Sequence, residues 1–213
     1  DRAMSGGPAY AWEPEKGVHI GIMPRNGSVN DLRWFKGDPS FVFHPMNAHT
    51  DHNIVTCDVC EFEQAPLFPW ADGTPGDPAK AVPRLTRWRF DLAANSDEFK
   101  SERLDDLACE FPRLDERFTA TNYRYGFFAA DNNPKFKVGG FNGIGRVDHE
   151  SGNTEIHDVG EACATNEPIF VPKSEDSPEG EGFVLANVYD ANRKASHLLI
   201  LDAQNVTAEP LAK

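Results

Sequence analysis

The chain has 213 residues, 39% hydrophobic and 26% charged, a balance typical of a folded globular protein rather than a disordered one. Its 34 acidic and 21 basic residues give a net charge of −13, which repels nucleic-acid phosphates and anionic lipid surfaces. No apolar run approaches the roughly 18 residues that suggest a membrane span, and four irregularly spaced cysteines do not form a secreted disulfide framework. We expect a cytoplasmic protein with no nucleic-acid partner and no transmembrane segment. Because the first residues carry neither an initiator methionine nor a signal pattern, we also expect a segment of something longer.

Short runs of aromatic, aliphatic and β-branched residues recur along the chain and predict β-strands. Between them lie clusters of Gly, Pro, Asn and Asp, which favour turns. No segment of helical length has a sustained 3.6-residue period, so the sequence predicts an all-β fold. The predicted strands cover residues 18–23, 41–44, 54–62, 85–92, 124–130, 168–172, 182–190 and 196–202, and the turns 24–28, 71–80, 131–135, 149–153 and 174–182.

A weak internal repeat narrows the architecture. Segments 87–104, 145–159 and 199–211 each have the order strand, Asp, polar turn, strand, and their aspartates are Asp91, Asp148 and Asp202. Spacings of 57 and 54 residues suit one four-stranded propeller blade with variable loops, and residues 21–35 are a candidate earlier copy. The repeat predicts a partial β-propeller of three to four blades. A β-sandwich, whose strands also recur every ten or so residues, is the competing architecture.

Three of the seven histidines lie in the stretch FVFHPMNAHTDHN, residues 41–53. Side chains alternate along a strand, so His44 and His49 are expected to point to opposite faces, while His52 falls in a polar turn. By spacing alone, a single buried histidine is more often a hydrogen-bonded core residue than a metal ligand. A loop metal site made by His49, Asp51 and His52 is a less favoured alternative.

The CDVC motif at residues 57–60 is compatible with zinc or redox chemistry, but neither a second ligand pair nor a helix N-terminus accompanies it. On a strand, Cys57 and Cys60 face opposite ways, which favours simple packing. Cys109 and Cys163 are likewise interpreted as core residues.

Glu110 and Glu167 each lie at a predicted strand edge between apolar neighbours, where a carboxylate needs a partner. One interpretation is a salt bridge to a nearby arginine such as Arg113. The other is that the carboxylate holds the ring and tautomer of a metal-bound histidine through the N–H that does not face the metal.

Six stretches in register resemble the carotenoid cleavage oxygenases, particularly the bacterial branch that includes lignostilbene dioxygenases. The resemblance runs from about residue 6 to the end, so residues 1–213 are interpreted as a fragment of a single β-propeller oxygenase domain. Several motifs in one order make it specific in a way that no single motif is. The stretches are GGPAYAWEPEKGVHIGIMPRNG, FVFHPMNAHTD, LTRWRFDL, LACEFPRLDERF, NEPIFVP and SHLLILDAQNVTAEPLAK.

The resemblance implies a seven-bladed propeller with a non-haem ferrous iron on its axis. Four histidines from different blades hold the iron in this family, and three of them are hydrogen-bonded to glutamate carboxylates. Family members use O2 to cleave a carbon–carbon double bond of an apolar polyene or stilbene, which gives two carbonyl products. The expected cofactor is therefore Fe(II), and the expected reactants are an apolar alkene and O2.

Carried over by motif, His44 matches an iron ligand, whereas Glu110 and Glu167 match the carboxylates that support ligating histidines; His49 and His52 match no ligand. The residue types suit the chemistry, because neutral imidazoles suit Fe(II) and nearby carboxylates balance its charge without occupying coordination positions. The 15 Phe and four Trp residues offer lining for an apolar tunnel.

The sequence also departs from the family pattern. Two histidine ligands that the family carries upstream, and one that follows the segment matching residues 208–213, have no counterpart here, and the acidic stretch at 173–182 is altered. The resemblance thus implies the middle and later part of an oxygenase, lacking other blades of its parent chain. The alternative is a metal-free β-propeller binding module in which His44 and the two glutamates are structural.

Overall fold

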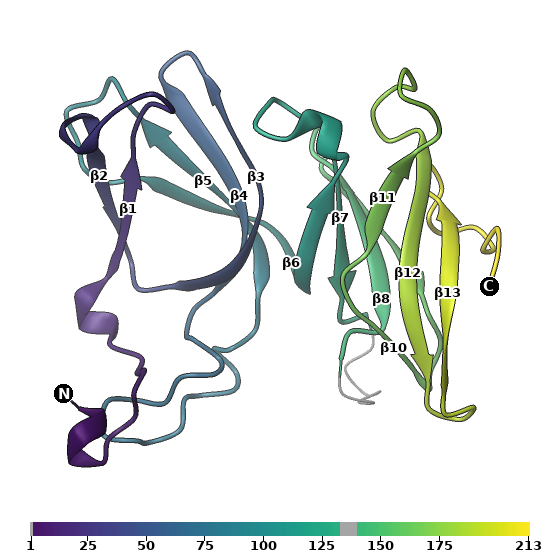
Figure 1. The fold of residues 1–213 in the computed structure, drawn as a ribbon, viewed down its shortest axis with the longest axis horizontal. Coiled ribbons are helices and arrows are strands. Elements are labelled where there is room, and N and C mark those ends of the chain that lie inside the picture. Colours follow the sequence, from purple (N-terminus) through teal and green to yellow (C-terminus); the bar gives the residue numbers. More distant parts are fainter. Residues whose placement is uncertain (1, 133–139) are drawn as a thin grey trace.

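The fold is described by a computed structural model, which covers residues 2–132 and 140–213 (Figure 1). The predicted turn at 131–135 lies partly outside these residues. The strands are β1 (Val18–Ile22), β2 (Arg33–Gly37), β3 (Phe41–Asp51), β4 (Ile54–Phe62), β5 (Arg84–Asp91), β6 (Lys100–Leu114), β7 (Tyr125–Ala130), β8 (Gly143–Asp148), β9 (Asn153–Asp158), β10 (Cys163–Thr165), β11 (Ile169–Pro172), β12 (Gly182–Asp190) and β13 (Ala195–Asp202).

Helical structure in the described residues is limited to four three-residue 3₁₀ turns, so the all-β prediction is confirmed. None of these turns is long and apolar enough to cross a membrane. The turns are η1 (Ala3–Ser5), η2 (Pro14–Lys16), η3 (Val29–Asp31) and η4 (Glu116–Phe118).

The strands form antiparallel sheets that stand side by side (Figure 1). Strands β3 to β9 pair in chain order, and β6 belongs to two sheets. Its first half pairs with β5. Its residues from Cys109 onward pair with β7, with a register shift between Glu110 and Arg113. Two four-stranded sheets result, β3–β6 and β6–β9. A third consists of β12 with β13 on one edge and β10 and β11, end to end, on the other. The first two strands, β1 and β2, form a separate two-stranded antiparallel sheet.

The three repeat aspartates occupy equivalent positions. Asp91, Asp148 and Asp202 each end the third strand of a sheet, at β5, β8 and β13. In each case the carboxylate accepts the backbone N–H two residues later, at 2.8, 3.0 and 2.9 Å respectively, and this contact starts the turn. The weak repeat in the sequence therefore corresponds to the same turn in three successive sheets.

The hydrophobic core is divided into three clusters, and each lies between neighbouring sheets. One, which includes Phe35 and Trp88, joins the β1–β2 hairpin to β4 and β5. A second, which includes Cys60 and Phe128, joins the two four-stranded sheets, and a third, which includes Phe127, joins β7 and β8 to β11–β13. Face-to-face packing of successive sheets is the packing of a propeller, not of a two-layer sandwich.

The cysteines lie in this core as predicted. Cys60 belongs to the cluster between the four-stranded sheets, whereas Cys57, on the other face of β4, packs in the cluster beside the hairpin. Cys109 is buried and Cys163 packs against the third cluster. All four thiols are unpaired.

A buried carboxylate also links the two four-stranded sheets. Asp58 on β4 is 1% exposed, and Arg87 donates to its two oxygens through Nε and Nη2, each at 2.7 Å. The Tyr123 hydroxyl, just before β7, donates to the same carboxylate at 2.6 Å. Burial alone raises the pKa of Asp58, but the hydrogen bonds and charge of Arg87 outweigh it and hold the pKa below its usual value.

Replacing Asp58 with alanine is expected to destabilise the fold by about 3–5 kcal/mol, because it leaves the Arg87 charge largely buried without a partner. Urea unfolding followed by fluorescence measures the change. The control is Asp97→Ala, which removes an exposed ion pair with Lys36 and should have a much smaller effect. Equal midpoint shifts for the two variants would contradict the prediction.

Candidate active site

His44 lies where the pairing of β3 with β4 is irregular, with register shifts on both sides of Pro45. Proline has no N–H for the ladder, so a bulge here disrupts pairing at little cost. The His44 side chain is 47% exposed, and its Nδ1 lies 2.6 Å from Oε2 of Glu110. Because a carboxylate only accepts, Nδ1 is the donor in this contact, and the tautomer with the proton on Nδ1 has its free lone pair on Nε2.

Glu110 is a nearly fully buried carboxylate, with a side chain 6% exposed. Its Oε2 also accepts the backbone N–H of Phe111, which has a left-handed φ of 55°. That conformation costs a bulky residue of order 1–3 kcal/mol and persists only where its surroundings impose it. Among the described residues, Oε1 of Glu110 has no hydrogen-bond partner at all. The site thus holds a buried negative charge that orients one histidine and is itself incompletely compensated.

Aromatic rings surround the pair. The His44 ring lies 5.3 Å from the centroid of Phe111 and 6.2 Å from that of Phe43, and Phe111 meets Phe141 edge-on at 6.0 Å. These contacts orient the imidazole plane and place apolar rings beside it.

Glu167 precedes β11, is half-exposed and does not contact His44. Its Oε1 accepts from Arg113 at 3.0 Å, and Arg113 also pairs with Glu116. Arg113 follows Glu110 by three residues on β6, so β6 connects the two glutamates. Among the described residues, Glu167 therefore contacts an arginine, whereas Glu110 contacts a histidine.

His49 and His52 lie away from this pair. His52 is in the β3–β4 turn, exposed and left-handed, and its Nδ1 lies 2.7 Å from Asp51. His49 faces a separate polar cavity beside Thr56. Across residues 2–132 and 140–213, no three His, Cys, Asp or Glu side chains are placed to hold a metal ion together, so the loop metal site is not formed.

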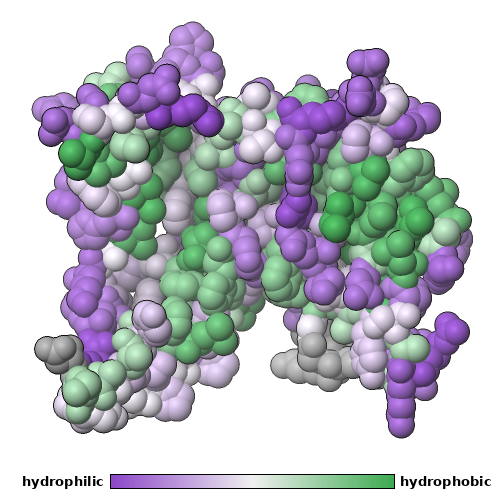
Figure 2. Space-filling view, viewed as in Figure 1, coloured by the Kyte–Doolittle hydropathy of each residue, from purple (hydrophilic) through white to green (hydrophobic). Residues whose placement is uncertain are grey.

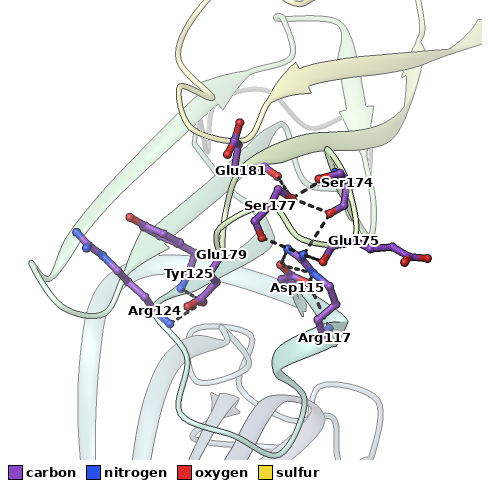
Figure 3. Close-up of polar contacts among 9 residues, drawn as sticks. All are labelled: Asp115, Arg117, Arg124, Tyr125, Ser174, Glu175, Ser177, Glu179 and Glu181. Carbon is purple, nitrogen blue, oxygen red and sulfur yellow. Dashed lines mark hydrogen bonds and ion pairs between the residues drawn. The ribbon is translucent and has the colours of Figure 1, made fainter.

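The altered acidic stretch, residues 173–182, forms the connection from β11 to β12 and is firmly attached (Figure 3). Arg117 Nη1 donates to the carbonyls of Ser174, Glu175 and Ser177 at 3.2, 2.7 and 3.0 Å, while Asp115 holds the other side of the guanidinium. Glu179 accepts the backbone N–H groups of Arg124 and Tyr125 at 2.7 and 2.9 Å. The loop is thereby bound to both ends of the β6–β7 connection.

The family model described as "Retinal pigment epithelial membrane protein" matches all of residues 1–213. An isoeugenol monooxygenase of Pseudomonas putida is 38% identical over 220 residues, which cover 100% of this chain and 46% of that protein. This chain belongs to the carotenoid cleavage oxygenase family. A lignostilbene-α,β-dioxygenase isozyme of Sphingomonas paucimobilis is 34% identical, with 100% and 46% covered. The chain thus spans slightly under half the length of these curated relatives.

Solved oxygenase structures agree in fold. The crystal structure of Pseudomonas brassicacearum lignostilbene dioxygenase matches with a TM-score of 0.92 at 32% identity, over 99% of this chain and 46% of that one. Cobalt-substituted Synechocystis ACO matches with a TM-score of 0.81 at 28% identity, over 94% and 41%. The partial β-propeller prediction is confirmed, and the sandwich alternative is wrong.

One buried group was not anticipated from the sequence. His149, just after β8, has a side chain 5% exposed whose Nε2 lies 3.7 Å from Asp58 and has no hydrogen-bond partner among the described residues. Burial lowers its pKa to about 4, against an opposing pull from Asp58. The only signal in the sequence was the alternation of Thr56 and Asp58 with apolar residues along β4, which implied a buried polar face.

The free energy of unfolding is expected to decrease as the pH falls from about 7 towards about 4.5. The folded pKa of His149, about 4, lies below its unfolded value of 6.5, so the unfolded chain binds the proton first. The loss through this group is at most about 3 kcal/mol by pH 4. Asp58 and Asp148 favour the charged ring, while Arg87 and His49 oppose it.

Unfolding free energies at several pH values test this. His149→Gln should flatten the profile between pH 7 and 4.5, whereas His52→Gln, which changes an exposed ring, should leave its slope as it is. A slope that survives in His149→Gln would assign the pH dependence to other groups.

Proposed function

We propose that this protein is a non-haem Fe(II) dioxygenase that uses O2 to cleave a carbon–carbon double bond of an apolar carotenoid, apocarotenoid or stilbene, giving two carbonyl products. The observation that carries the proposal is the His44–Glu110 contact, at the position where the family motif has an iron ligand. The names of the relatives, isoeugenol monooxygenase and lignostilbene dioxygenase, favour an aryl alkene within that class.

The residues present fit an iron ion. His44 has Nδ1 engaged by a carboxylate and Nε2 free, the arrangement usual for metal-ligating histidines. The unpartnered Oε1 of Glu110 leaves uncompensated negative charge beside the ring, which a nearby cation offsets. His44 Nε2 would hold the iron, with the remaining ligands outside this chain. Bound iron would supply a site at which O2 is activated.

The protein side chains then have separate tasks. Glu110 keeps the proton on Nδ1 of His44 and so keeps Nε2 available. Phe43 and Phe111, which contact the half-exposed His44 ring, and Phe141, which contacts Phe111, offer an apolar surface to the alkene. We assign Glu167 the same role as Glu110, towards a histidine outside this chain, since its carboxylate is half-exposed although Arg113 donates to it at 3.0 Å.

We further propose that residues 1–213 form part of one propeller domain, with further blades packing on β11–β13. One face of these strands is buried against β7 and β8, but the other is also apolar and open: Ile169 is 51% exposed, Phe183 36% and Leu198 51%. Figure 2 shows hydrophobic residues gathered over these strands, on the right of the view. An open apolar sheet face of this kind is normally covered.

A cytoplasmic location is part of the proposal. Cys60 and Cys109 are buried in the same cluster but form no disulfide, as expected in a reducing compartment.

The alternative function is a metal-free binding module. It is favoured by one observation: the described residues bring no three metal-ligating groups together. Iron content of the complete polypeptide encoded by the gene separates the two proposals, because a binding module would be purified without stoichiometric iron.

His44→Ala in the complete polypeptide is expected to abolish iron binding and alkene cleavage. Glu110→Gln keeps the shape but weakens the acceptor for Nδ1, so iron affinity or activity should fall by roughly 10 to 100-fold. Iron analysis and cleavage of a stilbene substrate measure both. His52→Ala, a change in an exposed histidine on the same hairpin, is the control. Unchanged iron and activity in His44→Ala would overturn the ligand assignment.

The 213-residue chain by itself is expected to bind iron weakly and to lack activity, because affinity comes from several preorganised ligands. It should also self-associate through the open face of β11–β13. Size-exclusion chromatography should show less association for Leu198→Lys than for the exposed polar change Asn205→Lys. Stoichiometric iron and turnover in the isolated chain would contradict the expectation.

A further inference from the structure

A second cavity lies on β3 beyond the candidate iron site. It has a volume of about 450 Å³, and six of its lining residues carry the argument: His49, Arg87, Arg89, Tyr123, Arg124 and His149. We call it the polar pocket. His49 follows His44 by five residues, roughly 16 Å of extended strand, so the polar pocket is separate from the His44–Glu110 pair.

Strand register builds one wall of the polar pocket. His49 pairs with Thr56, and Thr56 pairs with Arg89, so one row of polar residues crosses β3, β4 and β5. The next row on the same face runs through Asp58 to Arg87. The residues between them face the apolar cluster beside the β1–β2 hairpin. The other wall comes from Tyr123, before β7, and His149, after β8.

Some hydrogen-bond donors that line the polar pocket have no acceptor within the described part of the protein. Arg87 and Tyr123 both donate to Asp58. Arg89 donates to Glu102 through Nη1 alone, and its Nε and Nη2 have no partner among the described residues. These two groups form the edge of a guanidinium that matches the two oxygens of a carboxylate.

Two buried imidazole nitrogens are also unpartnered. The His149 side chain is 95% removed from solvent, and its Nε2 has no hydrogen-bond partner in the part of the chain that is described. Nδ1 of His49 is also buried and has no hydrogen-bond partner among the described residues. A buried polar atom without a partner costs about 1–3 kcal/mol, and both histidines line the polar pocket, so these two atoms require an explanation.

The acidic residues at the rim are already engaged. Glu150 pairs with Arg124 at 2.6 Å, and Glu179 accepts two backbone N–H groups. Arg124 in turn is bidentate to Asp148. The unused groups of Arg89 are donors, so a ligand that fits them must be an acceptor.

We propose that the polar pocket is a second ligand site, which binds a small organic carboxylate. The open edge of Arg89 takes the two carboxylate oxygens, and His149 and His49 supply the further polar contacts. The volume lies within the range of about 300–1,000 Å³ typical of small-molecule sites. The rings of Tyr123 and His149 pack edge to face, with centroids 4.8 Å apart, which fixes this wall of the polar pocket.

Benzoate is the probe, and isothermal titration calorimetry on the complete polypeptide is the measurement. Saturable binding is expected, and it should weaken at least tenfold in Arg89→Gln and in His149→Gln. Arg89 is partly exposed, so its variant tests the proposal even if His149→Gln fails to fold. Glu102→Gln removes the negative charge that competes for Arg89 and should retain binding. Arg193→Gln, which changes an exposed arginine in the β12–β13 turn, should bind as the parent does. Iron content should be the same in all of them.

Three results would overturn the proposal. The first is no saturable benzoate binding at concentrations up to roughly 10 mM, which corresponds to an affinity too weak for a built site. The second is equal binding by Arg89→Gln and Arg193→Gln. The third is a different ligand chemistry: inorganic phosphate binding more tightly than benzoate, or Zn²⁺ alone binding through His49 and His149.

Discussion

Strand β6 is the constraint on which the rest of the structure depends. It is 15 residues long and belongs to two sheets, pairing with β5 in its first half and with β7 in its second. Sharing one strand fixes how the two sheets face each other, and so fixes the buried cluster between them. The bulge in its second half turns Phe111 into a left-handed conformation and brings the Glu110 carboxylate to His44. The architecture and the candidate site therefore have the same origin.

Two buried carboxylates at this interface differ in how completely they are hydrogen-bonded, one in the core and one in the candidate site. Asp58 and Glu110 are both almost inaccessible, but Asp58 has a bidentate arginine and a tyrosine hydroxyl, which satisfy both of its oxygens. Glu110 has one oxygen shared by His44 and Phe111 and one with no partner among the described residues. A fully satisfied ion pair maintains a fold, whereas an incompletely satisfied carboxylate beside an exposed imidazole leaves binding capacity for a cation.

Much of the fold could be predicted from the sequence because its signals are local. Alternation of side chains identifies β4 and β12, and the aspartates that end β5, β8 and β13 mark turns through contacts two residues away. The continuity of β6 had no such signal, since its first half is exposed and charged and lacks an apolar alternation. The contact of His44 with Glu110 joins residues 66 apart, so spacing alone could not predict it. The family resemblance suggested a role for each residue but did not pair them. The burial of His149 could not be predicted for the same reason, because Asp58, 3.7 Å from its Nε2, lies on another sheet.

The unequal exposure of His44 and Glu110 suits the metal centre that we propose. A ligating histidine must present Nε2 to a space that side chains from other blades also reach, so its ring cannot be enclosed by its own sheet. The carboxylate behind it must be shielded, because water at Nδ1 would compete for the proton and release the ring. A 47% exposed ring backed by a 6% exposed carboxylate meets both conditions. A single chain segment of this kind preorganises one ligand only, and the binding energy of the site arises when several such segments converge.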